Sequence, residues 1–245
     1  MATTVPSIES QGEFWGNWAV KSDRGEGKGD PYDDRVCDIV RRVAYECKEH
    51  ERAIDIGCGT GWITRVLATR FGEVIGTDIA ASALQVAHRT VPGAHFIECD
   101  FLEANLGHSF FDLVVSCEVI AHVADQRAFF RRCRDIISPG GKFLLITQNP
   151  TVWHRHRGAT APSPHQLRHW LGRDEILEHA QAVGFRVLSI RTLEPAGDKG
   201  LLFWRPYVQG ALRRVIGRPA AKRALEAVGL GRSLVVEMEA VDNTH

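Results

Sequence analysis

The sequence predicts an α/β fold in which a mostly parallel, Rossmann-like sheet carries helices on both faces. Short apolar runs that are typical of strands alternate with segments whose apolar residues recur at helical spacing. The segment 53–63 joins a strand to a helix through a glycine-rich turn. The run 111–116 is almost continuously apolar, as in a strand that is buried on both faces of a parallel sheet.

The first 30 residues divide into an aromatic stretch and a glycine-rich one. Trp15 and Trp18 lie in a segment that is too interrupted to build a core of its own. We therefore expect either a flap over a pocket, with both tryptophans contacting the substrate, or simple docking on the outside of the domain. Asp30 and Pro31 are typical of a helix start, and the apolar spacing that follows predicts a helix to about Lys48.

The glycine turn at 53–63 predicts a ligand site. Its spacing is G-x-G-x-G, with Trp62 where the dinucleotide fingerprint has its last glycine. Asp55 stands just before the turn, and a carboxylate that faces the pocket would repel a pyrophosphate but suit an ammonium group. The next short strand, 73–78, ends in Asp78, where a carboxylate can accept hydrogen bonds from two ribose hydroxyls. Taken alone, the glycine turn could be purely structural, and Asp78 could be a solvent-exposed acid at a strand end.

Further elements follow at short intervals along the chain. Helices are predicted at 82–90, 125–137 and 173–183, and strands at 94–98, 142–147, 184–190 and 233–239. Asp100 and Phe101 follow a strand, and both are candidate ligand contacts. The alternative for Asp100 is a turn cap, and the alternative for Phe101 is a core residue. Because Glu118 and His122 are four residues apart, we expect both to point from one helical turn toward the pocket mouth. His122 has the pKa of a base that works near neutrality.

The loop 148–171 concentrates aromatic and basic side chains beyond a strand end, where α/β sheets bind ligands. Trp153, His154, His165 and His169 are candidate substrate contacts, because such side chains stack on rings and hydrogen-bond to polar groups. A solvated loop with incidental histidines is the alternative. His165 and His169 have metal-pair spacing, but no third ligand is evident, so we predict no metal.

The segment 195–232 is locally basic and amphipathic. It would serve as a lid that packs on the domain, or as a weak contact with a membrane, a lipid-linked substrate or a second subunit through 199–232. We divide the chain into an N-terminal flap (1–30), a core (31–194), this insertion (195–232), and a last core strand with a tail (233–245).

Composition narrows the classes of function. The chain has 245 residues, of which 44% are hydrophobic and 24% charged, and 30 basic residues balance 30 acidic ones. A formal charge of zero gives no global attraction to nucleic acid. The six cysteines form no C-x-x-C pair, no apolar run approaches the length of a spanning helix, and the first residues lack signal-peptide features. We therefore expect a cytoplasmic protein with reduced thiols.

An ordered series of motifs resembles the class I S-adenosylmethionine methyltransferases, in particular the ubiquinone-biosynthesis-like, small-molecule branch. The series comprises the acid and glycines of 55–61, the strand-end acid Asp78, the acid Asp100, the stretch Cys117-Glu-Val-Ile-Ala-His122, and the turn Ser138-Pro-Gly-Gly141. The resemblance covers about 32–193 and the last strand. It implies a seven-stranded sheet of order 3-2-1-4-5-7-6 whose last strand is antiparallel.

The same resemblance implies roles for individual residues. It assigns S-adenosylmethionine, with product S-adenosylhomocysteine, to Asp55, Gly57, Cys58, Gly59, Gly61, Asp78, Ile79, Asp100, Phe101 and Cys117. It assigns catalysis to His122 and Glu118. Some relatives hold a divalent metal through two acids and this histidine, but Ala121 replaces the second acid here.

The expected reaction is methyl transfer to an oxygen or nitrogen of a small-molecule acceptor, such as a secondary metabolite, a quinone-like or a sugar-like compound. A nicotinamide-dependent oxidoreductase would share the strand, the glycine turn and the ribose acid. A regulatory module that binds S-adenosylmethionine without catalysis would share the whole series. The acceptor itself and the oligomeric state are not encoded in any motif.

Overall fold

The computed structural model describes residues 5–25, 27–28, 30–108, 110–155, 161–195, 214 and 217–241. Its strands are β1 (Arg52–Ile56), β2 (Glu73–Asp78), β3 (His95–Glu98), β4 (Phe111–Cys117), β5 (Ile137–Gln148), β6 (Phe185–Pro195) and β7 (Gly231–Ala240). Its α-helices are α1 (Ile8–Ser22), α2 (Pro31–Tyr45), α3 (Trp62–Leu67), α4 (Ala81–Thr90), α5 (Gln126–Ile136), α6 (Pro150–Trp153), α7 (Arg173–Ala182) and α9 (Arg218–Ala227). A 3₁₀ turn spans Ile120–His122.

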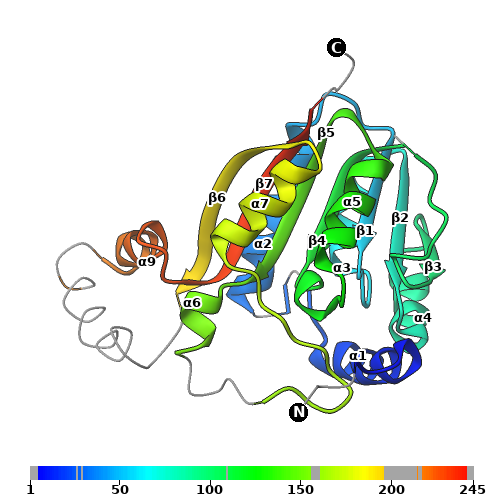
Figure 1. Cartoon of the computed structure of the whole chain (residues 1–245), viewed down its shortest axis with the longest axis horizontal. Helices are drawn as coiled ribbons and strands as arrows, with labels where there is room; N and C mark the ends of the chain where they lie inside the picture. The colour runs from blue at the N-terminus through cyan, green and yellow to red at the C-terminus, as the bar shows by residue number, and fades with distance from the viewer. Residues whose placement is uncertain are drawn as a thin grey trace.

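The strands form one sheet in the order β3-β2-β1-β4-β5-β7-β6 (Figure 1), which confirms the predicted topology. β7 is antiparallel to β5 and to β6, whereas the other pairs are parallel. β5 begins earlier than the predicted 142–147. Its pairing with β4 shifts between Phe111 and Leu113, and it is from Lys142 onward that the parallel register becomes regular. The Ser138–Gly141 turn therefore lies within an irregular first part of the strand.

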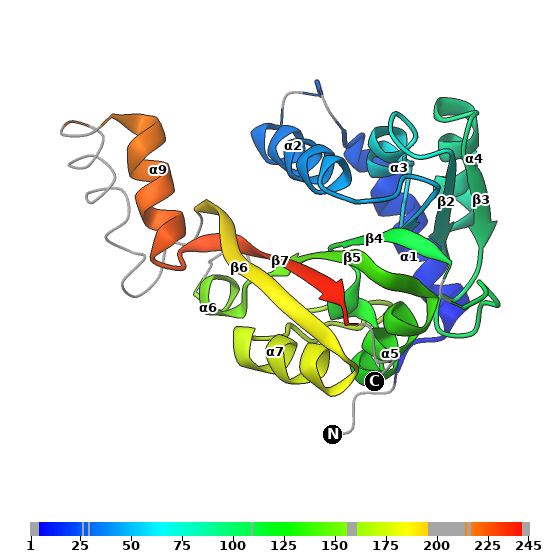
Figure 2. The ribbon, with the colours of Figure 1, turned by 90° about the horizontal axis from the view of Figure 1, so that it is seen from above.

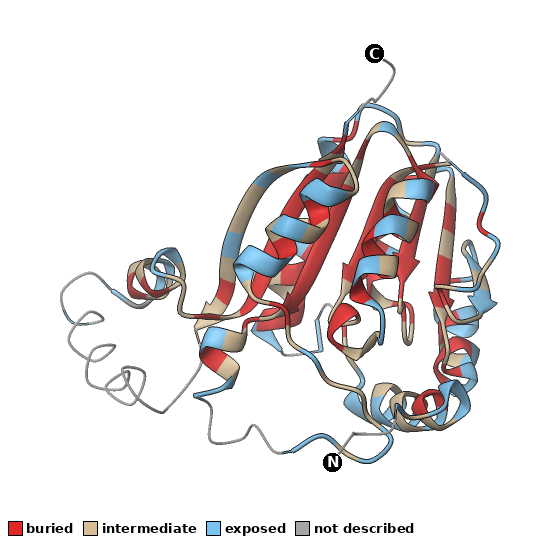
Figure 3. Cartoon of the chain, viewed as in Figure 1, coloured by how far each residue is buried: buried red, intermediate tan, exposed pale blue. Residues whose placement is uncertain are grey.

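Two apolar layers hold the helices to the sheet, with α2 and α3 on one face and α5 and α7 on the other (Figure 2). Val36 and Val40 of α2 are fully buried on the first face, as helical spacing predicts. Phe129 and Phe130 of α5 are fully buried on the second. The central strands are red along their length in Figure 3, because both of their faces are covered.

The N-terminal segment, for which the sequence predicts a flap or a docked segment, forms the helix α1. Ser7 caps its first turn, where its hydroxyl accepts a hydrogen bond from the Ser10 N–H. The helix lies across the carboxyl ends of the central strands and against α4 (Figure 1). Gly12 and Gly16 allow this approach, since a Cβ at Gly12 would lie 2.6 Å from the carbonyl oxygen of Ile79. Tertiary contact thus stabilises a helix that its own composition does not specify.

Much of the predicted insertion 195–232 lies outside the described residues, and so do three of its eight basic residues, Lys199, Arg205 and Arg213, on which its membrane and lid hypotheses partly depend. The described part, α9, sits beyond the β6 edge of the sheet (Figures 1 and 2). Arg35 of α2 makes a bidentate ion pair with Glu226 of α9, at 2.5 and 2.9 Å. No helix of the described chain is long and apolar enough to cross a membrane.

The glycine that precedes α3 gives a test of the packing between helices. Gly61 has a φ of +82°, and a Cβ there would lie 3.1 Å from that of Ala87. Gly229 has the same φ with no atom within 4 Å of a Cβ, so it is a matched control. We predict that Gly229→Ala lowers the free energy of unfolding by about 1 kcal/mol, because of its backbone conformation alone. Gly61→Ala should lower it by about 1–2 kcal/mol more, because its Cβ also crowds Ala87. Urea unfolding measures both, and equal costs would contradict the packing role.

Candidate cofactor and acceptor site

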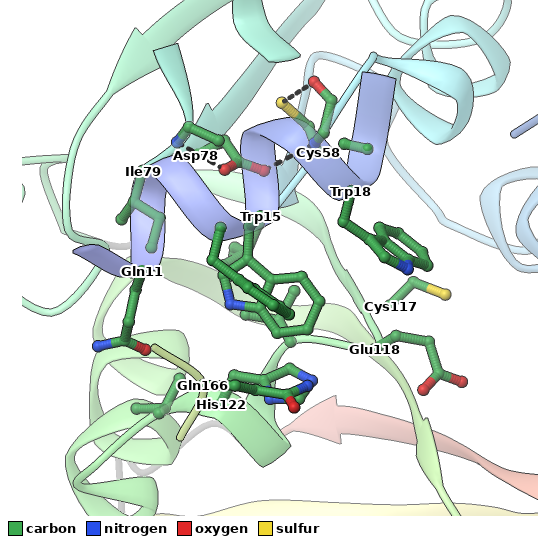
Figure 4. A pocket seen from close by; sticks show the side chains of 18 of the residues that line it. Gln11, Trp15, Trp18, Cys58, Asp78, Ile79, Cys117, Glu118, His122 and Gln166 are labelled. Atoms are coloured by element: carbon green, nitrogen blue, oxygen red, sulfur yellow. Dashed lines mark hydrogen bonds between the residues drawn. The ribbon is translucent and has the colours of Figure 1, made fainter. Parts of the chain in front are cut away.

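A cavity of about 870 Å³ opens at the carboxyl ends of β1, β2 and β4. The glycine turn, the ends of β2 and β4, and the helix α1 line it together with the loop that contains Gln166. Trp15, Trp18, Glu118 and His122 surround a shared space in this cavity (Figure 4). The fold therefore joins the glycine turn and the predicted catalytic residues in one site.

The glycine turn is fastened to the end of β2. The N–H groups of Gly57 and Cys58 donate to the carbonyl oxygen of Thr77, at 2.7 and 2.9 Å. Asp78 Oδ2 accepts the Gly59 N–H at 2.8 Å (Figure 4). At Gly57, where φ is +70°, a Cβ would lie 2.2 Å from Val119. At Gly59, by contrast, the nearest atom to a Cβ would be the Cβ of Ala19 in α1, at 3.9 Å, which is an ordinary van der Waals contact. Gly59 lines the cavity without a side chain, so a ligand can approach its backbone closely.

Asp78 lines the cavity, as predicted, and both of its oxygens are already engaged. Its Oδ1 accepts the N–H of Ala80 at 2.9 Å, in addition to the Gly59 bond on Oδ2. Burial raises the pKa of the carboxyl, while these backbone N–H groups lower it. Each carboxylate oxygen has a second lone pair, so the group can still accept a ligand hydroxyl.

Asp55, whose carboxylate the sequence predicts to face the pocket, is not among the residues that line the cavity, and its role toward the cofactor stays a prediction. It is 1% exposed, and its Oδ2 accepts a 2.7 Å hydrogen bond from the Thr64 hydroxyl of α3. Burial raises the pKa of its carboxyl to about 7. Gly61 also stays outside the lining, because it contacts α4 instead. Both residues shape the turn from beneath.

The remaining predicted cofactor residues reach the cavity. The lining includes Cys58, Ile79, Asp100, Phe101 and Cys117. Asp100 Oδ1 also accepts the Leu102 N–H at 3.0 Å, so this acid is at once the turn cap and the cavity residue that sequence analysis gave as alternatives. Phe101 is 7% exposed and packs on Phe129 at a centroid distance of 5.2 Å, so it too belongs both to the core and to the cavity wall.

Glu118 is held by two hydroxyl groups from distant parts of the chain. Its Oε1 accepts hydrogen bonds from Tyr32 Oη at 2.7 Å and from Ser233 Oγ at 2.8 Å. Burial raises the pKa of Glu118, and these two bonds lower it. The pKa of Tyr32 is also raised well above its ordinary value, most strongly by burial and next by the charge of Glu118. Tyr32 therefore keeps its proton and remains a hydrogen-bond donor.

The predicted helical placement of Glu118 is wrong. Its φ is +62°, in the left-handed region, and the 3₁₀ turn begins only at Ile120. Glu118 and His122 therefore do not share a helix face, although both line the cavity. A left-handed residue of this size is uncommon and is retained where surrounding structure fixes it, here by the bonds to Tyr32 and Ser233.

His122 is oriented by a backbone carbonyl. Its Nδ1 lies 2.7 Å from the carbonyl oxygen of Leu167, and because a carbonyl only accepts, Nδ1 carries the proton. The unprotonated Nε2 is thus the acceptor of this ring. Trp15 packs on the imidazole at a centroid distance of 4.3 Å (Figure 4). Burial lowers the pKa of His122 to about 4, so the ring is neutral at physiological pH.

The predicted substrate contacts divide into two groups. Trp15, Trp18 and Trp153 line the cavity, whereas His154, His165 and His169 do not. These three histidines are exposed. His165 contacts Ser10 of α1 at 2.6 Å, and the His169 N–H donates to the carbonyl oxygen of Ala121 at 2.7 Å. They connect the 161–171 segment to its neighbours from outside the cavity.

Sequence reasoning missed several charged residues of the cavity. Arg24 pairs with buried Asp33 at 2.6 Å, and its Cζ lies 4.8 Å from the Trp62 ring centroid and 5.9 Å from that of Trp18. The motif Asp30-Pro31 marked the helix start, but nothing in the pattern shows that Asp33 faces inward. Arg168 and Arg232 also line the cavity. Among the described residues no three potential ligands gather as a metal site, and the absence of a metal stays a prediction.

The chain is similar to known methyltransferases in sequence and in structure. A family model described as a methyltransferase domain matches residues 31–190. A ubiquinone biosynthesis O-methyltransferase of Bradyrhizobium sp. (strain ORS 278) is 32% identical over 145 residues, 57% of this chain and 56% of that protein, so the match spans little more than half of that relative. One from Rhodopseudomonas palustris (strain BisB5) is 30% identical over 190 residues, 70% and 73% of the two chains.

Among solved structures, the N-methyltransferase NodS from Bradyrhizobium japonicum WM9, in complex with S-adenosyl-L-homocysteine, has a TM-score of 0.67. It is 13% identical, and the match covers 95% of this chain and 100% of that one. This likeness shows a shared fold.

The raised pKa of Asp55 predicts a pH-dependent stability. Its carboxyl binds a proton more tightly in the folded state, so its contribution is present at low pH and is lost as the pH rises through about 7. Between pH 5.5 and 8.5 the free energy of unfolding of the wild type should fall by about 2 kcal/mol relative to that of Asp55→Asn, whose side chain cannot ionise. Urea unfolding of both proteins at the two pH values measures the difference. Parallel pH curves would show that Asp55 ionises normally.

Proposed function

This chain belongs to the class I S-adenosylmethionine-dependent methyltransferases, and from that membership we propose that it methylates an oxygen or nitrogen atom of a small-molecule acceptor. The observation that carries the proposal is the single cavity in which the open backbone at Gly59 and the carboxylate of Asp78 adjoin Glu118 and His122. One end suits a nucleoside, and the other suits an acceptor that must lose or share a proton.

The residues of the turn fit S-adenosylmethionine. Gly59 presents bare backbone to the cavity, and Asp78 and Asp100 offer carboxylate oxygens to hydroxyl and amino groups. Phe101 supplies an apolar wall. When bound, the cofactor supplies an electrophilic methyl group on a sulfonium, so the protein chiefly has to exclude water and position a nucleophile in line with it.

The part of the cavity that is proposed to hold the methyl acceptor contains two side chains that can accept hydrogen bonds, His122 and Glu118. His122 offers a neutral Nε2, whose orientation is fixed by the bond from Nδ1 to Leu167. Glu118 has one oxygen engaged by Tyr32 and Ser233, and within the described part of the chain no hydroxyl donates to its Oε2. We assign His122 as the group that accepts or orients the acceptor proton, and Glu118 as a second contact to the acceptor.

The names of the relatives favour O-methylation and quinone-like acceptors, since both relatives described above are ubiquinone biosynthesis O-methyltransferases. The N-methyltransferase with the same fold keeps nitrogen acceptors within the proposal. Family membership leaves no support for the nicotinamide-dependent oxidoreductase. A module that binds the cofactor without catalysis is distinguished by methyl transfer from labelled S-adenosylmethionine into an acceptor from a cell extract.

We predict that Asp78→Ala weakens S-adenosylhomocysteine binding at least tenfold. Two hydrogen bonds to a charged group are at stake, each worth about 1.5–3 kcal/mol. Glu98→Ala is the matched control, because this exposed carboxylate ends the neighbouring strand outside the cavity. Isothermal titration calorimetry measures affinity, and thermal melting shows whether the turn survives the loss of the Gly59 bond. Unchanged affinity in a folded variant would refute the ribose role.

We predict that His122→Asn lowers turnover by about 10²-fold or more and leaves cofactor affinity unchanged. An asparagine amide can replace Nδ1 as donor to Leu167 but offers nothing at the position of Nε2. Because the pKa of His122 in the wild type is about 4, this histidine does not titrate between pH 6 and 8, and its titration should not change turnover in that range. Labelled methyl transfer across this pH range provides the measurement. Wild-type turnover in His122→Asn would place the base elsewhere.

A further inference from the structure

We propose that the hydroxyl groups of Tyr32 and Ser233 take the role, at Glu118, that a divalent metal has in some related methyltransferases. They hold the Glu118 carboxylate in place, so this chain orients its methyl acceptor without a metal ion. The inference rests on the proposed function, because Glu118 and His122 line the acceptor half of the same cavity (Figure 4).

One oxygen of Glu118 is already fully engaged. Its Oε1 accepts a hydrogen bond from Tyr32 Oη at 2.7 Å and another from Ser233 Oγ at 2.8 Å. A carboxylate oxygen accepts through two lone pairs, and these two bonds use both of them. The Tyr32 and Ser233 oxygens also lie 3.0 Å apart, so the three groups form one compact cluster. Glu118 therefore keeps a single oxygen, Oε2, with which it could bind a metal or a ligand.

The other residues of the motif do not complete a metal site. Ala121, which stands in place of the second acid of the related proteins, is fully buried, and its side chain has no ligand atom. Its carbonyl oxygen accepts the His169 N–H at 2.7 Å. His122 donates from Nδ1 to the carbonyl oxygen of Leu167, so only its Nε2 could bind a metal.

One carboxylate oxygen and one imidazole nitrogen make a poor set of ligands. A catalytic zinc ion takes three protein ligands, and Mg²⁺ or Ca²⁺ needs six or more ligands that are mostly oxygen atoms. Within the described part of the chain, no three side chains of histidine, cysteine, aspartate or glutamate gather in an arrangement that could hold a metal. The donor atoms of the site therefore do not fit the metal of the related proteins.

Positive side chains already lie close to the carboxylate cluster. Arg232 lies over the ring of Tyr32 with its Cζ 4.0 Å from the centroid, and the Cζ of Arg24 lies 5.6 Å from the same centroid. Burial raises the pKa of Glu118, whereas the bonds from Tyr32 and Ser233 and then the charges of the two arginines lower it. A divalent cation would have to approach Glu118 against both of these positive charges.

The hydroxyl pair also fixes the direction of Glu118. This residue has a φ of +62°, a backbone conformation that is uncommon for glutamate and needs support from its surroundings. Tyr32 belongs to α2 and Ser233 to β7, so two elements far apart in the sequence provide that support. Tyr32 and Ser233 are thus positioning residues. They leave Oε2 of Glu118 to accept an O–H or N–H of the methyl acceptor.

Metal binding tests one half of this proposal. Mn²⁺ is titrated into the complex with S-adenosylhomocysteine and followed by electron paramagnetic resonance, and Zn²⁺ is titrated by calorimetry. We expect wild type and Glu118→Gln to bind each metal with affinities within about threefold of each other, because Glu118 supplies no metal site. A larger preference of the wild type for either metal would overturn the proposal. Labelled methyl transfer into a cell extract should also persist in EDTA, and its loss would overturn the proposal as well.

The position and the hydrogen bonds of Glu118 test the other half. In crystals with S-adenosylhomocysteine, we expect the Glu118 carboxylate to leave its wild-type position in Tyr32→Phe/Ser233→Ala and to keep it in Ser233→Thr. In solution, carboxyl ¹³C NMR of glutamate-labelled protein gives a Glu118 signal, which is assigned by its loss in Glu118→Gln. This signal should shift in the single variants Tyr32→Phe and Ser233→Ala, each of which retains one hydroxyl.

Tyr45→Phe is the matched control, because Tyr45 ends the same helix and its side chain is exposed. It should leave the Glu118 signal unchanged. A Glu118 carboxylate that stays in place in the double variant, or a signal that neither single variant shifts, would overturn the positioning role. Failure of the wild type to bind S-adenosylhomocysteine would instead count against the proposed function.

Discussion

The close contact between the glycine turn and the end of β2 is the constraint on which the rest of the site depends. Asp78 accepts the N–H of Gly59 from the turn and the N–H of Ala80 at the start of α4. One carboxylate therefore joins the first strand-turn-helix unit to the second. Gly57 has no room for a side chain because Val119, after β4, fills that space. Three parallel strands thus converge on one turn, and the cavity forms where they meet.

The predictable part of the fold is the part encoded by local pattern. The strand 73–78 and the helix that begins at Pro31 were predicted with their observed starts, because apolar period and capping residues lie next to one another in the chain. The helix α1 was missed because it packs against residues far away in the sequence, namely α4 and the Ile79 backbone that Gly12 approaches. The apolar pattern within a short stretch of sequence cannot reveal such a long-range contact.

The candidate site shows the same division between local and distant information. Asp78 and Glu118 could be found because Asp78 ends a strand and Glu118 directly follows one, and the carboxyl ends of parallel strands meet at one edge of the sheet. The partners of Glu118 could not, since Tyr32 precedes it by 86 residues and Ser233 follows it by 115. The buried position of Asp55, outside the cavity lining, could not be predicted for a related reason. Sequence shows that an acid stands before the turn, but its inward direction depends on Thr64, which the fold brings beneath the turn.

Charge is distributed unevenly inside a protein whose formal charge is zero. Asp78 and Asp100 line the cavity at the ends of β2 and β3, whereas Arg168 and Arg232 line its other part. The acidic residues lie in the part of the cavity that is proposed to hold the cofactor, and the two arginines lie in the part that is proposed to hold the methyl acceptor. Arg168 lies over the Trp170 ring and Arg232 lies over the Tyr32 ring, and these contacts help to hold the two guanidinium groups in place. Net charge limits what the surface attracts, but the positions of a few charged side chains decide what the cavity selects.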